Sequence, residues 1–250
     1  MQGMERTVNG WGLWRGGGGA RVACAAVAAA IAAPLVLAAP FGAPALAQGT
    51  VAGRVSIQEK PGAKTTDLGN AVIYLEPKGG APRVAPVNTQ MAMNGRSFAP
   101  HVRVVTAGSR VDFPNQDPFT HNVFSTTVGA LFDLGAYGNG KSKPAEFRKP
   151  GAFPIYCNVH AKMAGYVVVV NTPWYTQAGN DGRWEIAHVP AGTYTMTVWH
   201  ERAPSPVTSE VEVPAAGLAA LETKLDASGY KEVAHKDKNG KDYSTHGVVY

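Results

Sequence analysis

Short stretches in which apolar and polar residues alternate recur along the chain from residue 48 onward. Val, Ile, Tyr and Phe are frequent in these stretches, and Gly, Pro and Asn separate them, a pattern typical of β-strands joined by turns. We find no convincing amphipathic helix. We therefore predict an all-β protein, with strands at residues 51–57, 71–75, 90–93, 102–106, 110–113, 123–126, 152–156, 166–170, 184–186, 193–199, 209–213 and 221–225.

The breaks between these strands divide them into three groups. A Gly- and Pro-rich segment at residues 78–86 separates the first two strands from the next six, and Pro173 precedes the last four. Residues 231–250 alternate in charge and contain few apolar side chains. We expect this ending to be a loosely attached polar tail.

The first 47 residues have the features of a secretory signal peptide. Three Arg residues precede an uncharged Ala/Val/Leu-rich run at residues 22–39, and a small-residue A-x-A ending follows at Ala47. We therefore expect cleavage near Ala47 and export to the periplasm. An uncleaved membrane anchor is the alternative, because the run is nearly as long as the ~20 residues that a spanning helix needs. Its richness in Ala and the presence of Pro34 disfavour that alternative, and no later segment is apolar enough to span a bilayer.

Composition excludes two broad classes of function. With 45% hydrophobic and 16% charged residues, the chain is an ordinary globular protein and not a long disordered one. After residue 47 the chain carries 20 basic and 17 acidic side chains. This near balance removes the electrostatic argument for nucleic-acid binding, which usually needs a concentrated basic face.

Soft metal-binding side chains are concentrated in the middle group of strands. Cys157, His160 and Met163 are spaced as C-x2-H-x2-M, and His121 lies 36 residues before the Cys at the entry to another strand. The two-residue period of the strand before Cys157 directs its side chain inward. One thiolate, two imidazoles and a thioether suit copper in both oxidation states, and a His2Cys set with a weak axial Met is diagnostic of a blue-copper site.

The cysteine count supports a mononuclear site. Cys24 lies before the predicted cleavage site, so the exported chain retains Cys157 as its single thiol. A dinuclear thiolate-bridged copper centre and a c-type haem are both excluded, because each needs more cysteines than remain. We expect the other five histidines to be surface or structural residues, and Met91 and Met93 to pack in the core and not to form a second copper site.

At these residues the chain resembles the cupredoxins. The ligand loop is spaced like the short one of amicyanin, and the resemblance covers residues 88–171. It implies a Greek-key β-sandwich. The segments similar to plastocyanins are Phe98-x-Pro100, Val111-x-Phe113-x-Asn115 and His121-Asn122-Val123.

The resemblance also implies a role for each residue of the site. His121, Cys157 and His160 would be the strong ligands of one copper ion that cycles between Cu(I) and Cu(II), with Met163 as the long axial ligand. Asn122 would connect the two ligand-bearing segments and hydrogen-bond near the sulfur, which tunes the metal.

The flanking strands resemble the carboxypeptidase regulatory-like, transthyretin-type β-sandwiches. Gly53-x-Val55 and the Asn70–Leu75 segment match the opening half of that family, and residues 181–198 match its closing half. The predicted architecture is a cupredoxin sandwich inserted in, or followed by, a second small sandwich. The alternative, in which the first two strands extend the cupredoxin sheet, stays open. The predicted boundaries are a signal peptide at 1–47, opening strands at 48–86, the cupredoxin at 87–172, closing strands at 173–228 and a tail at 229–250.

The order of these parts is similar to periplasmic plastocyanin-domain chains labelled methylamine utilization proteins, a label that names no substrate. The chain has no paired carboxylates, no nucleophile with its base and no metal with an open position, so we expect an electron carrier and not an enzyme. Its expected partner is a periplasmic cytochrome or dehydrogenase. The alternatives are a copper delivery or storage protein, and a cell-envelope interaction module in which copper is structural.

Overall fold

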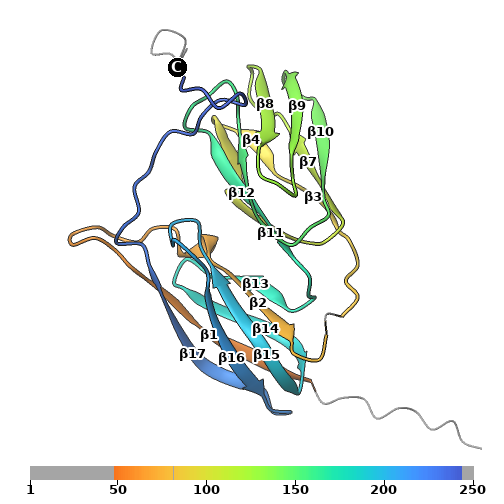
Figure 1. Cartoon of the computed structure of the whole chain (residues 1–250), viewed down its shortest axis with the longest axis vertical. Helices are drawn as coiled ribbons and strands as arrows, with labels where there is room; N and C mark the ends of the chain where they lie inside the picture. Colours follow the sequence, from red (N-terminus) through yellow and green to blue (C-terminus); the bar gives the residue numbers. More distant parts are fainter. Residues whose placement is uncertain (1–47, 81, 244–250) are drawn as a thin grey trace, which may run out of the picture. The chain divides into compact units, whose positions relative to one another are not determined.

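The computed structural model describes residues 48–80 and 82–243, in which seventeen strands and one short 3-10 helix, η1 (Leu68–Asn70), are found (Figure 1). The prediction of an all-β protein is confirmed. The predicted signal peptide lies outside the described residues. The strands are β1 (Gln48–Gln58), β2 (Val72–Pro77), β3 (Asn88–Gln90), β4 (Ala92–Asn94), β5 (Ser97–Ala99), β6 (Val102–Thr106), β7 (Ser109–Pro114), β8 (His121–Ser125), β9 (Phe132–Tyr137), β10 (Ser142–Phe147), β11 (Gly151–Tyr156), β12 (Ala164–Val170), β13 (Tyr175–Gln177), β14 (Arg183–Pro190), β15 (Gly192–Trp199), β16 (Val207–Val213) and β17 (Leu218–Asp226).

Strands β3 to β12 form the first β-sandwich. Its larger sheet has the order β6-β12-β11-β8-β9, its smaller sheet has the order β10-β7-β3, and β4 pairs with β5. Strands β6 and β12 run parallel, whereas β12, β11, β8 and β9 are successively antiparallel. Both sheets contribute buried side chains to one core, including Phe113 and Phe147 from the smaller sheet and Ile155 and Val167 from the larger one.

The alternation along β11 positions the functional residue that follows it. Phe153 and Ile155 are buried in the core, while Pro154 and Tyr156 between and after them are partly exposed. Because side chains on a strand alternate between its two faces, Cys157 continues the inward series and is completely buried. All five residues of β8 are buried as well, so His121 also lies inside the sandwich.

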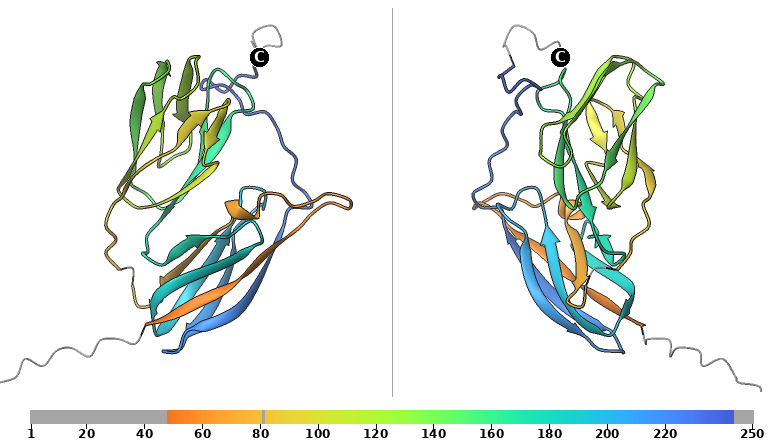
Figure 2. Two further views of the ribbon diagram at one scale, coloured as in Figure 1. Left: turned by 180° about the vertical axis from the view of Figure 1, so that it is seen from behind. Right: turned by 45° about the vertical axis from the view of Figure 1, so that its right-hand side comes forward.

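Strands β1, β2 and β13 to β17 form the second β-sandwich (Figure 2). One sheet has the order β14-β1-β17 and the other β13-β2-β15-β16. Strand β1 runs antiparallel to β14 and parallel to β17, which is more than 150 residues later in the chain. The first two strands therefore pair with the last ones and not with the sheets of the first sandwich. The exact domain boundaries stay a prediction.

Gly53 shows how closely the strands of this second sandwich approach each other. A Cβ atom at this position would lie 2.2 Å from the carbonyl oxygen of Leu221 and 2.7 Å from the indole of Trp184. Gly is therefore required here by the close approach of its neighbours and not by an unusual backbone angle.

Several strands escaped the sequence pattern. The predicted strand at 90–93 is divided between β3 and β4, which pair with different partners. Strands β9 and β10 contain Gly, Pro and charged residues, and each lies at the edge of its sheet. An edge strand pairs with a neighbour on one side only, and its backbone groups on the other side make no bonds within the sheet. Pro144, which lacks an N–H, is therefore tolerated in β10.

The C-terminal segment also differs from the expectation. Residues 231–243 have no regular secondary structure, but they do not hang loosely, because His235, Lys238 and Tyr243 all hydrogen-bond to the first sandwich. Charge alternation along this segment gave no indication of these contacts. Within the part of the chain that the structure describes, no helix has the length and apolar character needed to cross a membrane.

Candidate metal centre

The loop Cys157–Met163 connects β11 to β12 and is closed by its own backbone. The N–H of Cys157 donates to the carbonyl of Met163 (3.1 Å), and the N–H of Met163 donates to the carbonyl of His160 (3.0 Å). The strands on either side are paired in register up to Tyr156 and Ala164. The loop is therefore a tight turn on a rigid hairpin, and its side chains have little freedom to separate.

His121 reaches the same place from the neighbouring strand. Strand β8 pairs with β11 through Phe124 and Tyr156, which brings the first residue of β8 beside the end of β11. His121 Nδ1 lies 3.5 Å from Cys157 Sγ, and His160 Nδ1 lies 3.6 Å from the same sulfur. The structure thus brings the donor atoms of three of the four predicted ligands, His121, Cys157 and His160, close together.

These distances fit a metal ion bound between the three donors. Metal–nitrogen bonds of about 2.0–2.1 Å and metal–sulfur bonds of about 2.3 Å, set at tetrahedral to trigonal angles, separate N and S by about 3.5–3.8 Å. The three donor atoms all lie within 4.8 Å of one another. One soft thiolate with two imidazoles is a donor set that suits copper.

Met163 and Asn122 also lie at the site. Met163 is 2% exposed and belongs to the same buried cluster as Cys157. Asn122 follows His121 in β8, and its side-chain Oδ1 accepts the N–H of Asn158 in the loop (3.3 Å). Asn122 therefore connects the two segments that carry the candidate ligands.

Asp117 is a site residue that the sequence analysis did not single out. Its Oδ2 accepts a hydrogen bond from His121 Nε2 at 2.7 Å, and its carboxylate also accepts the N–H groups of Gly95 (2.7 Å) and Arg96 (2.9 Å). A carboxylate only accepts hydrogen bonds, so in neutral His121 the proton is held on Nε2 and the lone pair of Nδ1 is directed toward Cys157. The one signal in the sequence is an Asp four residues before the His.

The pKa shifts at the site follow from burial and these hydrogen bonds. Burial raises the pKa of the Cys157 thiol, but the hydrogen bond that the protonated form of His121 donates from Nδ1, together with backbone N–H groups, outweighs burial and holds this pKa below its ordinary value. Burial lowers the pKa of His121, yet its bonds to Cys157 and Asp117 outweigh that effect and raise the pKa overall. The pair therefore favours the thiolate form of sulfur, which is the form that binds metals.

His160 lies between the buried donors and the surface. It is partly exposed, and its ring contacts those of His121 (centroids 4.8 Å apart) and Phe119 (5.7 Å). The guanidinium of Arg96 stacks over Phe119, and Val159 next to His160 is 43% exposed. Burial, together with the nearby charges of His121 and Arg96, lowers the pKa of His160.

Met91, Met93, His101 and His200 make other contacts and are not part of this group of donors. Met91 and Met93 are fully buried in the core of the first sandwich. His101 Nε2 is 3.2 Å from a carboxylate oxygen of Glu201. His200 forms a second cluster with Asp67 and Glu201, but one ring nitrogen bonds the carbonyl of Asp67 and the other accepts the N–H of Arg202. His200 therefore has no free lone pair for a metal in this arrangement.

Comparisons with known proteins give structural similarity only. No protein-family model matches the chain, and no curated protein matches it. A purple cupredoxin from Nitrosopumilus maritimus is 24% identical and is similar over 33% of this chain and 99% of its own, with a TM-score of 0.31. An oxidised amicyanin mutant is 19% identical over 40% of this chain and 99% of its own, with a TM-score of 0.32. A copper-containing nitrite reductase from Thermus scotoductus is 28% identical over 36% of this chain and 24% of its own, with a TM-score of 0.32.

Proposed function

We propose that this protein is a periplasmic type 1 copper protein of the cupredoxin kind that carries single electrons between redox partners. One observation supports this most strongly. The Nδ1 atoms of His121 and His160 both lie within 3.6 Å of the buried sulfur of Cys157, with Met163 buried in the same cluster. Two imidazoles and one thiolate, with a thioether beside them, are the donors of a blue-copper site.

Each of these residues has a distinct part in holding the ion. His121, Cys157 and His160 would be the three strong ligands, and Met163 the weak axial one. Copper bound there supplies a one-electron couple between Cu(I) and Cu(II). The chain supplies a site that is already assembled, so little rearrangement is needed when the charge at the site changes.

The surroundings support this rigidity. Asp117 accepts a hydrogen bond from Nε2 of His121, the ring nitrogen that does not face Cys157. Asn122 connects β8 to the loop through the N–H of Asn158. His160 is the ligand candidate nearest to solvent, with Phe119 and the exposed Val159 beside it. We propose that electrons enter and leave at this apolar area, where a periplasmic cytochrome or dehydrogenase docks. We propose that the protein acts as an electron carrier and not as an enzyme.

Copper titration of residues 48–250 tests the proposed function. The metal-free protein should take up one equivalent of Cu(II) and develop an intense visible thiolate-to-copper band, and it should then show a reversible one-electron wave. Cys157→Ser should lose the band and keep its β-sheet circular dichroism, because a hydroxyl cannot replace the thiolate bond. Full visible absorption in Cys157→Ser would contradict the ligand assignment, and His121→Ala provides the same test for β8.

The same experiment separates the alternative functions. A delivery or storage protein should release copper quickly to a chelator or an acceptor protein, whereas a buried thiolate site should hold it. A purely structural copper should raise the unfolding temperature without giving a reversible wave. Tight retention together with a reversible wave supports the electron carrier, and either other pattern counts against it.

A further inference from the structure

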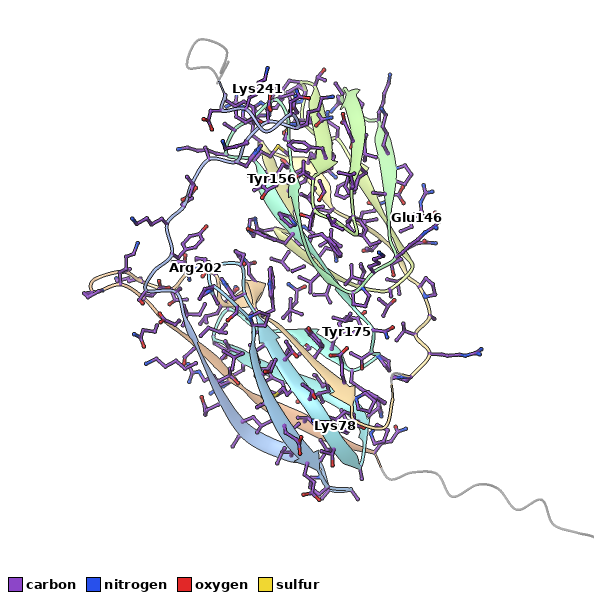
Figure 3. All side chains as sticks on the ribbon, viewed as in Figure 1. Lys78, Glu146, Tyr156, Tyr175, Arg202 and Lys241 are labelled. Carbon is purple, nitrogen blue, oxygen red and sulfur yellow. The ribbon has the colours of Figure 1, made fainter. Side chains whose placement is uncertain are left out.

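The C-terminal segment passes over the outside of the candidate metal centre. Residues 235–243 lie beside the loop Cys157–Met163, as Figures 1 and 2 show for the dark-blue end of the chain next to the β11–β12 turn. In Figure 3, Lys241 of this segment and Tyr156 of β11 lie at the same end of the first sandwich. Residues 235–243 contact the loop Cys157–Met163 through particular hydrogen bonds and ring contacts.

Two side chains of the segment bond directly to carbonyl groups of the loop. The hydroxyl of Tyr243 donates to the carbonyl of Cys157 (3.0 Å). Nε2 of His235 lies 3.1 Å from the carbonyl oxygen of His160, and Nδ1 lies 2.8 Å from the carbonyl oxygen of Lys236, so a proton on Nε2 is donated to the loop. The backbone N–H of His235 donates to the carbonyl of Ala161 (3.2 Å). Three carbonyls of a seven-residue loop are therefore held from outside, and two of them belong to candidate ligands.

Ring packing adds to these bonds. The imidazole of His235 stacks on the ring of Tyr156, with centroids 4.5 Å apart and an angle of 25° between the planes. Tyr243 packs edge-on against the ring of His235, with centroids 5.4 Å apart. Tyr156 directly precedes Cys157. The stacking of His235 on Tyr156 therefore packs against the end of β11, where Cys157 begins the loop.

A second connection reaches the site through charged groups. The backbone N–H of Lys238 donates to the side chain of Asn158 (2.8 Å), and Lys238 Nζ pairs with Asp133 on β9 (2.6 Å). Asp133 in turn accepts a hydrogen bond from Asn122 (2.7 Å), which also accepts the N–H of Asn158. The C-terminal segment thus joins the same network that connects β8 to the loop.

The shape of the segment explains how these side chains reach their partners. A turn closes at residues 237–241, where the backbone N–H of Asp237 donates to the carbonyl of Lys241 and the backbone N–H of Lys241 donates to the side-chain Oδ1 of Asp237 (both 2.8 Å). Gly240 in this turn takes a positive φ of 77°. This turn redirects the chain toward the loop so that Tyr243 reaches Cys157. Between residues 231 and 243, only His235, Asp237 and Tyr243 are partly buried, and the other side chains are exposed.

We propose that residues 235–243 form the outer wall of the metal centre, with Tyr243 and His235 as positioning residues for the loop Cys157–Met163. Fixing the carbonyl of Cys157 fixes the plane of the peptide between residues 157 and 158, and so restrains the backbone of the residue that carries Sγ. The inference concerning copper rests on the proposed function, whereas the inference concerning the loop does not. The wall occupies the Asn158 and Ala161 side of the loop, so docking of a partner is left to the side of Phe119 and Val159.

Truncation tests the proposal, with residues 48–250 compared with residues 48–230. The shorter protein keeps all seventeen strands and loses the wall. In the metal-free proteins, we expect backbone amides of residues 157–163 to exchange with deuterium at least about 10-fold faster after truncation. In the copper-loaded proteins, we expect loss of copper to excess chelator to be about 10- to 100-fold faster, the range typical of residues that support metal ligands.

Point variants separate positioning from general stability. Tyr243→Phe keeps the ring and removes its hydrogen bond to the carbonyl of Cys157. His235→Phe keeps an aromatic ring beside Tyr156 and removes the ring-nitrogen contacts with the carbonyls of His160 and Lys236. Each should speed copper loss about 3- to 10-fold and shift the visible band. The unfolding temperature of the metal-free protein should fall by about 5 °C or less. Val233→Ala is the matched control, because Val233 lies in the same segment and is 83% exposed.

The outcomes distinguish the two proposals. Failure of every protein to bind copper would overturn the proposed function, and amide exchange in the metal-free proteins would still decide on the wall. Equal exchange of residues 157–163 in the long and short proteins overturns the wall, even if both bind copper tightly. If the truncated protein does not fold, unchanged exchange and copper loss in both Tyr243→Phe and His235→Phe overturn it instead.

Discussion

Asp117→Asn tests the buried carboxylate behind His121. The Asp117 side chain is 7% exposed and accepts three hydrogen bonds. Its Oδ1 takes the N–H of Gly95, and its Oδ2 takes the N–H of Arg96 and the Nε2–H of His121. An Asn side chain has one accepting oxygen and one NH2 group, so it can serve one of these two sides only.

The structure sets the expected size of the loss. With the amide oxygen toward His121, the NH2 group would face the N–H of Gly95, so one hydrogen bond is lost and two are weakened because the charge is gone. Hydrogen bonds to charged groups contribute about 1.5–3 kcal/mol each. We therefore expect the free energy of unfolding of the metal-free protein to fall by about 2–4 kcal/mol.

Asp117→Asn should also change the reduction potential of bound copper and its affinity for the site. A carboxylate on the far nitrogen makes the imidazole a stronger donor and places negative charge near the ion, which favours Cu(II). Asp117→Asn should therefore raise the reduction potential and weaken Cu(II) binding by about 10- to 100-fold. Urea titration, voltammetry and competition with a chelator measure the three quantities.

Asp112→Asn is the matched control for this experiment. Asp112 lies on β7 and pairs with Arg110, which is 49% exposed, so its loss should cost about 1 kcal/mol or less and leave copper binding unchanged. If Asp117→Asn matches Asp112→Asn in stability, affinity and potential, Asp117 has no role in holding His121, and the reasoning is wrong.

Three further changes test other parts of the molecule. Met163→Gln should retain copper but lower the potential, because a harder amide oxygen favours Cu(II); loss of all copper on titration would make Met163 a structural ligand. Glu59→Gln should lower stability at pH 7 by about 1–2 kcal/mol, since the hydrogen bond from the Arg202 guanidinium lowers the pKa of Glu59. That contribution is present above the unfolded pKa of about 4.3 and disappears as the pH falls through the lower folded pKa, so urea titrations of the two proteins should converge in acid; a constant difference would contradict this. Gly53→Ala should destabilise the second sandwich by about 3 kcal/mol because its Cβ would overlap the Leu221 carbonyl, while the visible copper band stays unchanged; wild-type unfolding in urea would show that β17 can shift.

Local pattern predicted much of the fold and most of the candidate site. Strand β15 alternates between Thr and apolar residues, and this period follows from the geometry of an extended chain. The same period directed Cys157 inward, and C-x2-H-x2-M fits into a tight connection between two strands. These features depend on residues close together in the sequence, where pattern carries the information.

Long-range pairing was decided only by the tertiary structure. Strand β1 matches β17 in parallel more than 150 residues away, and no short window of sequence distinguishes that partner from a strand of the first sandwich. Edge strands β9 and β10 lack a clear pattern, and each of them pairs with a neighbour on one side only. Their place depends on the neighbour that they pair with and not on their own composition.

The surroundings of the metal centre were likewise settled by folding. Asp117 is one of many acidic residues in the sequence, and it becomes a partner of His121 because the turn before β8 places it against the ring. The segment that contains His235 and Tyr243 has the composition of a solvated tail, yet it hydrogen-bonds to the loop around Cys157. The sequence by itself determined which side chains can bind a soft metal, since that is a property of their chemistry; the folded chain decided which groups orient them, since that depends on contacts between distant segments.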